Sequence, residues 1–311
     1  MSAILHNIGV FFGHLADVGW EALGLALLCQ FTKLCCVSRA WRNIIAASYP
    51  ETPVPWRTVF AALLARVGVN AVIPARGGDA VGLFLVKRQL EGSTYPTLGS
   101  TLVGLTLFDF VAASCFIVYA LSIGALPGRS VLERLPGFDF HWFVGHLRGT
   151  LIVVGVILFA LVLLLLWFAE QLIEFRRRIA QGFAIFSNKS EYLRHVAVWQ
   201  LLDWTLRLTA IFFFLRAFHV PATLHNAVLV QVTQSLAVLF PISPSGIGTE
   251  QALLLYIFRG KAAKTVLLSF SVGMRVTLII FNAALGFGSI LIMLRTLRWR
   301  AQVEPEAYAE R

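Results

Sequence analysis

The stretch LGSTLVGLTLFDFVAASCFIVYALSIGAL, residues 98–126, contains a single charged residue, Asp109. A helix needs about 20 mostly apolar residues to cross the hydrocarbon core of a bilayer. Four more segments meet or approach that length, namely 18–37, 149–169, 195–218 and 265–294. The sequence therefore predicts an all-α protein whose helices cross a membrane several times.

The composition of the whole chain supports the same class. Hydrophobic residues make up 58% of the 311 residues and charged residues only 14%, with a mean hydropathy of +0.77. A soluble globular chain carries about 25% charged residues, so most of this surface is expected to face lipid. The net charge of +10 would suggest nucleic acid for a soluble protein. Membrane proteins, however, gather Lys and Arg in cytoplasmic loops and beside anionic headgroups, and we expect no nucleic-acid partner.

Two further apolar stretches, about 58–86 and 226–258, are interrupted by proline and glycine. The interruptions read PARGGD at 74–79 and PISPSGIGTE at 241–250. Irregular backbone at membrane depth must lie inside protein or against a water-filled cavity. Each stretch is therefore predicted to be a re-entrant or broken-helix hairpin, with two ordinary helices joined by a surface loop as the alternative. The predicted break positions are Pro74, Gly77, Gly78, Pro241, Pro244, Gly246 and Gly248.

The distribution of basic residues predicts the orientation. Fourteen of them fall in four segments that we assign to the cytoplasmic side, a C-terminal tail included: Arg39, Arg42, Arg57, Lys87, Arg88, Arg176, Arg177, Arg178, Lys189, Arg194, Arg295, Arg298, Arg300 and Arg311. Seven fall on the other side: Arg129, Arg134, Arg148, Arg216, Arg259, Lys261 and Lys264. Cytoplasmic loops carry the excess of Lys and Arg, so the chain is expected in the cytoplasmic membrane with its C-terminus inside.

With this orientation the two halves of the chain repeat each other upside down. Residues 1–311 are expected to form a single transmembrane domain, with a first repeat at about 18–126 and a second at about 195–294. Span 149–169 and a basic cytoplasmic interfacial segment, 170–194, would join them; a solvated linker helix is the alternative for the latter. Inverted repeats are common in transporters, whose substrate site lies where two discontinuous helices meet. The repeat predicts that Asp79 and Glu250 approach one another.

Nine charged residues fall within or at the edge of the predicted membrane layer. A charge at the bilayer centre costs about 2.5–3.5 kcal/mol on insertion scales, so these residues call for partners or for a function. Five are basic and four acidic: Lys33, Arg66, Arg76, Arg207 and Arg275, and Asp79, Asp109, Asp203 and Glu250. The near balance of sign predicts that many are paired. Asp203 and Arg207 lie one helical turn apart, and the simplest interpretation is that their charges neutralise each other.

The charges at the two breaks are the candidate binding residues. Arg76 lies beside a glycine pair, where its planar guanidinium can bind a phosphate together with backbone N–H groups. Arg66 or Arg275 is expected to assist it, and Arg275 shares a polar helix face with Asn282 and Gly286. Asp79 and Glu250 each open a new helix; capping of the helix N-terminus is an alternative role for Asp79.

At these two breaks the sequence resembles a known family, the flippase-like transmembrane domain of lysylphosphatidylglycerol synthases and related free-standing membrane proteins. Residues 70–79, NAVIPARGGD, are similar to its Asn-x-x-x-Pro-x-Arg-x-Gly-Glu pattern, and residues 240–250, FPISPSGIGTE, to its Pro-x-Ser-Pro-Gly-Gly-x-Gly-x-x-Glu pattern. Asp79 stands where the family has Glu, and Leu105-Thr106 replace a Glu-Arg pair, which leaves Asp109 alone. The resemblance implies transfer of a lipid with a charged or glycosylated headgroup between leaflets, and it adds Asn70 to the candidate site.

The expected function is therefore a flippase-like transporter for a membrane lipid with an anionic or modified headgroup, with a lipid-modifying enzyme as a further expected partner. We expect no catalytic residue, cofactor or metal, because the sequence lacks metal-ligand spacings, a Walker loop and a nucleophile elbow. One alternative is a membrane-embedded transferase acting on a lipid carrier, with Asp79, Asp109 or Glu250 as the base. Another is a non-catalytic scaffold of a lipid-modifying complex.

Overall fold

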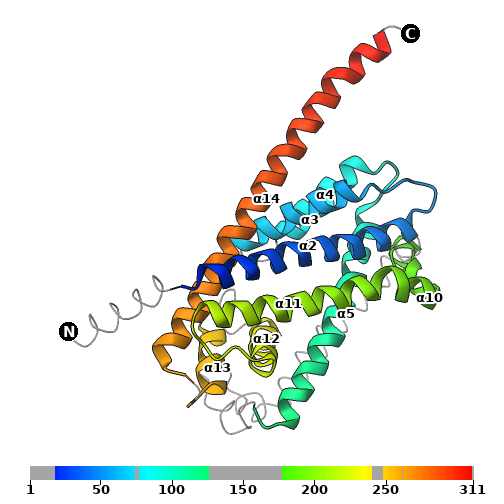
Figure 1. The fold of residues 1–311 in the computed structure, drawn as a ribbon. Helices are drawn as coiled ribbons and strands as arrows, with labels where there is room; N and C mark the ends of the chain where they lie inside the picture. The colour runs from blue at the N-terminus through cyan, green and yellow to red at the C-terminus, as the bar shows by residue number, and fades with distance from the viewer. Residues whose placement is uncertain (1–17, 74–76, 126–176, 240–247, 261, 310–311) are drawn as a thin grey trace, which may run out of the picture.

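The computed structural model describes residues 18–73, 77–125, 177–239, 248–260 and 262–309, and the described part is a bundle of helices (Figure 1). The first half contains α2 (Trp20–Ser48), α3 (Trp56–Val72), α4 (Gly77–Gln89) and α5 (Tyr95–Ser122). The second half follows a short irregular stretch, η1 (Ala184–Ser187), α10 (Lys189–Tyr192) and the π-turn η2 (Leu193–Ala197). It contains α11 (Val198–Ala217), α12 (Leu224–Leu239), α13 (Thr249–Ile257) and α14 (Lys264–Ala309).

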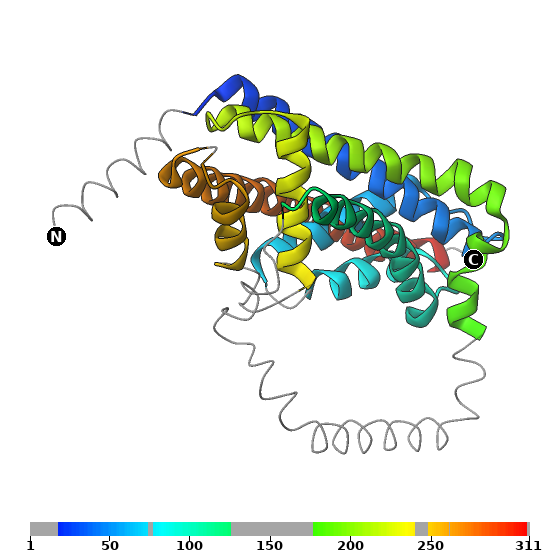
Figure 2. The same cartoon turned by 90° about the horizontal axis from the view of Figure 1, so that it is seen from below.

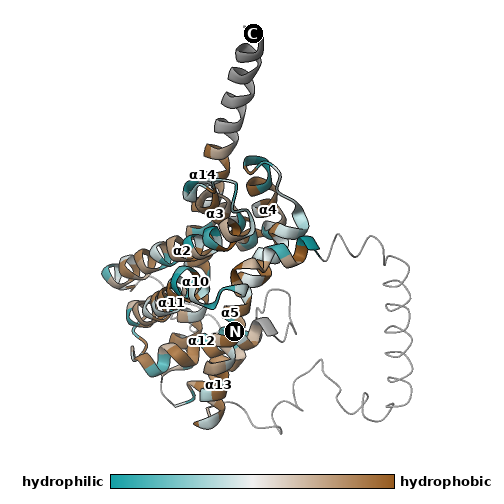
Figure 3. Ribbon diagram, turned by 90° about the vertical axis from the view of Figure 1, so that its right-hand side faces the viewer, coloured by the Kyte–Doolittle hydropathy of each residue, from teal (hydrophilic) through white to brown (hydrophobic). Residues whose placement is uncertain are grey.

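Four segments are long and apolar enough to cross a membrane: Trp20–Ser48, Tyr95–Ser122, Lys189–Ala217 and Lys264–Met293. They confirm four of the five predicted spans, and the fifth, 149–169, lies outside the described residues. Figure 3 shows apolar residues, in brown, along most of these helices, while hydrophilic residues, in teal, gather around α10 and at the turns. The chain is thus an all-α polytopic membrane bundle.

Between these spans lie two pairs of helices that are shorter. In the first pair α3 has 17 residues and α4 has 13; in the second α12 has 16 and α13 has 9. At 1.5 Å per residue α4 is about 20 Å long and α13 about 14 Å, well short of a hydrocarbon core of about 30 Å. These lengths suit the predicted re-entrant hairpins, while the re-entrant path and the inverted repeat remain predictions.

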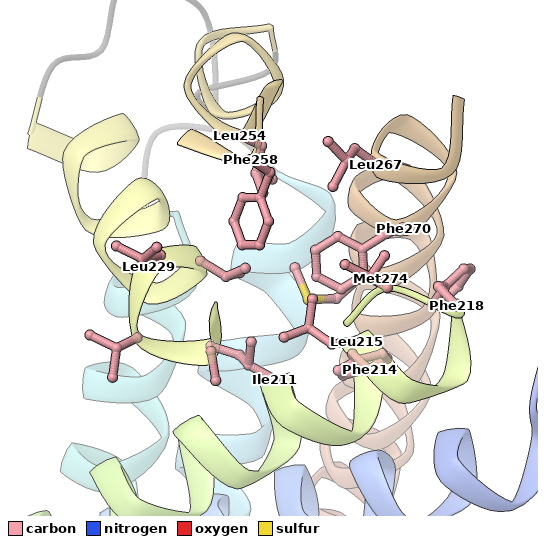
Figure 4. Close-up of a cluster of buried hydrophobic side chains, with 14 of the residues drawn as sticks. Ile211, Phe214, Leu215, Phe218, Leu229, Leu254, Phe258, Leu267, Phe270 and Met274 are labelled. Carbon is pink, nitrogen blue, oxygen red and sulfur yellow. The ribbon is translucent and has the colours of Figure 1, made fainter. Parts of the chain in front are cut away.

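Each short pair packs in its own apolar cluster. The α3–α4 pair shares a core with the second half of α2 and the start of α5, including Trp41, Ile44, Leu63 and Leu98. The α12–α13 pair packs against α11 and the start of α14, where the buried side chains of Phe214, Leu229, Leu254, Phe258 and Phe270 meet (Figure 4). Each broken pair therefore has its own apolar cluster, and each cluster is completed by residues of the other half, such as Met293 in the first and Ala26 in the second.

Two helices extend past their predicted ends. α2 continues to Ser48, so Arg39 and Arg42 belong to a helix and not to the predicted loop. The cause is an apolar stripe at helical spacing, Ala40, Trp41, Ile44 and Ile45, which is fully buried. α14 likewise continues to Ala309 and extends away from the bundle (Figure 1), so the predicted tail is helical over most of its length.

Three of the four segments predicted to be cytoplasmic, those before the C-terminal tail, gather at one end of the bundle, which we call the basic end. Hydrogen bonds tie them together: Asn43 Nδ2 donates to the carbonyl of His195 at 2.6 Å, Thr58 Oγ1 to Gln89 Oε1 at 2.9 Å, and the Thr94 amide to Tyr49 Oη at 3.1 Å. In Figure 2 this is the end at which α10 and α11 begin. Its described basic residues are Arg39, Arg42, Arg57, Lys87, Arg88, Arg177, Arg178, Lys189 and Arg194.

The described part of the predicted interfacial segment, 177–194, packs onto the basic end. Ile185 is buried in the core of the first half, and Phe186 stacks on Tyr192 with ring centroids 4.8 Å apart. Gln181 Nε2 donates to the carbonyl of Ser48 at 2.7 Å. This stretch is therefore folded against the bundle, and its placement in the membrane plane stays a prediction.

A close helix crossing joins α3 to α14 at Gly68 and Gly286. A Cβ atom built on Gly286 would lie 2.5 Å from the Cα of Gly68 and 2.7 Å from the carbonyl oxygen of Leu64. Without a driving force from water, membrane helices associate through such small residues, which let two backbones approach closely. The crossing brings the predicted polar face of α14 into the interior of the bundle.

Candidate functional site

The first helix break is closed by a network around Asp79, in the first turn of α4. Arg66 Nε on α3 lies 2.7 Å from Asp79 Oδ1, and Asn70 Nδ2 donates to the same oxygen at 3.0 Å. Asn70 also accepts a hydrogen bond from the Gly78 amide at 2.8 Å. That amide is one of the groups at a helix start that have no partner within the helix. Asn70 therefore joins the end of α3 to the start of α4, and Arg66 neutralises the acid between them.

Gly78 makes this network possible because it lets α4 approach α3. A Cβ atom at position 78 would lie 2.1 Å from the carbonyl oxygen of Arg66 and 2.8 Å from the amide nitrogen of Asn70. At the neighbouring Gly77 the nearest atom would be the Cγ2 of Ile73, at an ordinary 3.4 Å. Of the two glycines, only Gly78 is thus required for the close contact between α4 and α3.

Gly78→Ala is expected to break this network, whereas Gly77→Ala keeps it. Overpacking against atoms that cannot move costs about 1–3 kcal/mol, and here the atoms met are backbone. The measurement is thermal unfolding of both variants in detergent, followed by tryptophan fluorescence. A Gly78→Ala protein as stable as Gly77→Ala would contradict the close approach of the two helices.

The second break carries a comparable acid and arginine. Glu250, in the first turn of α13, is 8% exposed, and its Oε2 lies 3.2 Å from the Nη1 of Arg275 on α14. Gln234 on α12 also hydrogen-bonds the Glu250 carboxylate. Gly248, just before the helix, has φ +92°, a conformation that glycine adopts without strain. Its amide donates to Gln251 Oε1 at 2.7 Å.

The structure thus brings together some of the predicted site residues. Arg66, Asn70 and Asp79 meet at the first break, and Glu250 meets Arg275 at the second. The approach of Asp79 to Glu250 is not tested by these contacts and stays a prediction. Of the other predicted site and break residues, Gly77, Gly78 and Gly248 are described as above. Arg76, Pro74, Pro241, Pro244 and Gly246 lie outside the described residues.

A third polar cluster, in the middle of the bundle, was not predicted as part of the site. Asp203 on α11 is 1% exposed, and its Oδ2 lies 3.1 Å from Arg207 Nη2, as its spacing predicted. Asp109 on α5 lies 3.7 Å from the same nitrogen and accepts a hydrogen bond from Trp204 Nε1 at 2.8 Å. The guanidinium of Arg207 also lies over the Trp204 ring, 4.5 Å from its centroid. Asp109 is therefore not alone: α11 supplies the partners.

The cluster continues through α2 to α14. Lys33 is close enough to Arg207, Asp203 and Asp109 to interact with them electrostatically. Its Nζ lies 3.4 Å from Gln30 Oε1, and Gln30 Nε2 donates to Asn282 Oδ1 at 3.3 Å. Two cations and two carboxylates thus meet between helices of both halves. The sequence marked these four charged residues because each lies within a predicted span. Their spacing alone did not show that they form one cluster.

Several polar atoms of this region are buried without a hydrogen-bond partner in the described structure: Asp203 Oδ1, Gln200 Oε1 and Arg207 Nε. A buried polar group left unsatisfied costs about 1–3 kcal/mol. Such atoms are suited to ordered water or to polar groups of a ligand. The central cluster thus contains acceptor and donor atoms that its own side chains leave unsatisfied.

Comparison with known proteins agrees with these features. The family model described as the lysylphosphatidylglycerol synthase TM region matches residues 7–286, which include all the helices up to the Gly68–Gly286 crossing. No curated protein matches the chain. The match also covers both helix breaks and the central polar cluster.

Proposed function

Because the chain belongs to the lysylphosphatidylglycerol synthase TM region family, we propose that it is a flippase-like transporter, which moves a lipid with an anionic or modified headgroup between the leaflets of the cytoplasmic membrane. The observation that carries the proposal is the pairing of an acid with an arginine at each of two helix breaks. Transporters bind substrates and coupling ions where discontinuous helices meet inside the membrane. The basic end would face the cytoplasm, as the excess of Lys and Arg favours.

The two ion pairs supply groups that a charged headgroup needs. A headgroup phosphate would replace Asp79 at Arg66, or Glu250 at Arg275, because a guanidinium binds either oxyanion through the same N–H donors. The carboxylate released from its arginine would then accept hydrogen bonds from hydroxyl or ammonium groups of the lipid. Substrate and protein would in this way exchange partners, and no charge would be left unpaired in a medium of low dielectric constant.

The central cluster would continue the path between the breaks. Its charges are balanced, and its unpaired atoms include both acceptors and a donor. A headgroup crossing there would meet hydrogen-bonding groups in place of hydrocarbon, where a single charge costs several kcal/mol. The acyl chains would remain in the bilayer beside the helices.

The proposal is tested by headgroup accessibility in proteoliposomes. Labelled anionic, aminoacylated and polyprenyl-phosphate lipids are reconstituted with the protein, and an impermeant quencher reports which leaflet they occupy. Wild type should transfer at least one lipid class. Asp79→Asn and Glu250→Gln, each of which leaves an arginine without its carboxylate, should lose at least tenfold in rate, and Arg76→Ala is compared with them.

Glu191→Gln is the matched control, because Glu191 is an exposed acid at the basic end, outside both breaks. Retention of transport by this variant and its loss in folded Asp79→Asn would support the proposal. Equal transport rates in all variants would show that the ion pairs at the two breaks take no part in transport. Absence of transport by folded wild type, together with product formation from an activated donor and a lipid acceptor, would favour the transferase.

A further inference from the structure

A hollow of about 340 Å³ opens at the basic end, beside the turn that connects α4 to α5. It lies outside the two breaks and the central cluster. Its lining includes Phe84, Lys87, Arg88, Glu91, Ser93 and Tyr95. The hollow thus combines two cations, one carboxylate, two hydroxyls and two aromatic rings within twelve residues of chain.

The two cations are held in place by the aromatic rings. Lys87 Nζ lies 4.5 Å from the centroid of Tyr95, and the guanidinium carbon of Arg88 lies 5.2 Å from that of Phe84. Cation–π contacts fix a side chain without neutralising it. No described carboxylate lies within 4 Å of either cation, Glu91 included. Both charges therefore remain available to an anion from outside.

An exposed apolar stripe leads from the hollow along α5. Tyr95 is 45% exposed, Val103 56% and Leu107 48%, and their spacing puts them on one side of the helix. Gly99 lies on the same side, and a Cβ atom there would meet nothing within 4 Å. Phe84 adds a further exposed ring from α4. A molecule seated in the hollow can thus continue as a chain on an apolar surface within the membrane.

We propose that this hollow binds the phosphodiester headgroup of an anionic phospholipid, with the acyl chains lying along α5. The phosphate would interact with Lys87 and Arg88, and the exposed carboxylate of Glu91 would receive hydrogen bonds from headgroup hydroxyls. Two cations and one carboxylate leave a net charge of +1, which matches a singly charged phosphodiester. Tyr95 and Phe84 suit the interface, where aromatic side chains are enriched.

The site differs from the one proposed for transport and does not depend on it. Lys87 follows Asp79 by eight residues on the same helix, which corresponds to about 12 Å along its axis. A lipid bound at one end of α4 would tie that end to the membrane interface, while the other end forms the first break. Its test therefore needs no transport assay.

The experiment is native mass spectrometry of the full chain in a neutral detergent, with phosphatidylglycerol or phosphatidylcholine added in steps. Wild type should retain phosphatidylglycerol more tightly than phosphatidylcholine. Lys87→Gln with Arg88→Gln should weaken retention of phosphatidylglycerol about fivefold for each cation removed, as one basic residue near an anionic lipid contributes. The control is Arg177→Gln with Lys189→Gln, which removes one arginine and one lysine, both exposed, from the same end.

Weaker retention of phosphatidylglycerol in the Lys87–Arg88 variant alone supports the site. Equally weak retention in the control variant overturns it, since general electrostatic attraction to the basic end would then explain the binding. Complete displacement of phosphatidylglycerol by millimolar inorganic phosphate would contradict the proposal of a lipid site and indicate a site for a free anion. If the double variant does not fold, Glu91→Gln decides the question: the charge balance predicts tighter retention, and unchanged or weaker retention contradicts it.

Discussion

Gly286→Ala is expected to force α14 away from α3 and to lower the free energy of unfolding by about 3 kcal/mol, the upper part of the range for overpacking. The added Cβ atom would meet the Cα and amide nitrogen of Gly68 and the carbonyl oxygen of Leu64, all within 2.9 Å. These are backbone atoms, so the clash is relieved only by moving a helix. The measurement is thermal or denaturant unfolding in detergent, followed by tryptophan fluorescence.

Gly288→Ala provides the control two residues further along the same helix, where an added Cβ atom meets nothing within 4 Å. It is expected to match wild type or exceed it slightly, because alanine favours a helix. Gly68→Ala should reproduce the loss seen at Gly286, since the clash is mutual. Equal stability of the Gly286 and Gly288 variants would contradict the packing of α3 on α14.

Arg207→Leu is expected to have an effect of similar size, about 3–5 kcal/mol, because it leaves a buried charge without its partner. Asp203 is almost fully buried and would lose its ion pair, while Asp109 would lose the nearest cation. Lys33 lies nearby, but no described hydrogen bond joins it to Asp203. Unfolding in detergent, compared with wild type at the same pH, measures the loss.

Two further variants separate charge from packing. Asp203→Asn added to Arg207→Leu should recover part of the lost stability, since it removes the unpaired charge. Arg216→Leu, at the exposed end of α11, should leave stability within about 0.5 kcal/mol of wild type. A double variant no more stable than Arg207→Leu alone would show that the charge of Asp203 is not the source of the loss.

The spans were predictable from the sequence because their signal is local. Twenty apolar residues in a row have few alternatives to crossing a membrane, and four of the predicted spans are found in the described structure. The ends were less predictable. Arg39 and Arg42 marked a loop by their charge, yet the buried stripe through Trp41 and Ile45 continues α2 to Ser48.

The residues of the candidate site were named from the sequence, but their pairing was not. Gly78 and Asp79 lie together at a visible break, and the arginines within the membrane layer were expected to have partners. The pairing itself depends on the fold: Arg66 is 13 residues from Asp79, and Arg275 is 25 from Glu250. Nothing in the spacing of Lys33, Asp109 and Asp203 placed them in one cluster, because the packing of α2, α5 and α11 does so.

One face of α14 carries Arg275, Asn282 and Gly286, each of which contacts a different part of the bundle. They meet Glu250 at the second break, Gln30 beside the central cluster, and Gly68 between the two residues that hold Asp79. A helix is stiff along its axis, so a shift or rotation of α14 displaces all three contacts at once. A movement of α14 that changed the Arg275–Glu250 pair would therefore also change the contact at Gly68, beside the first break.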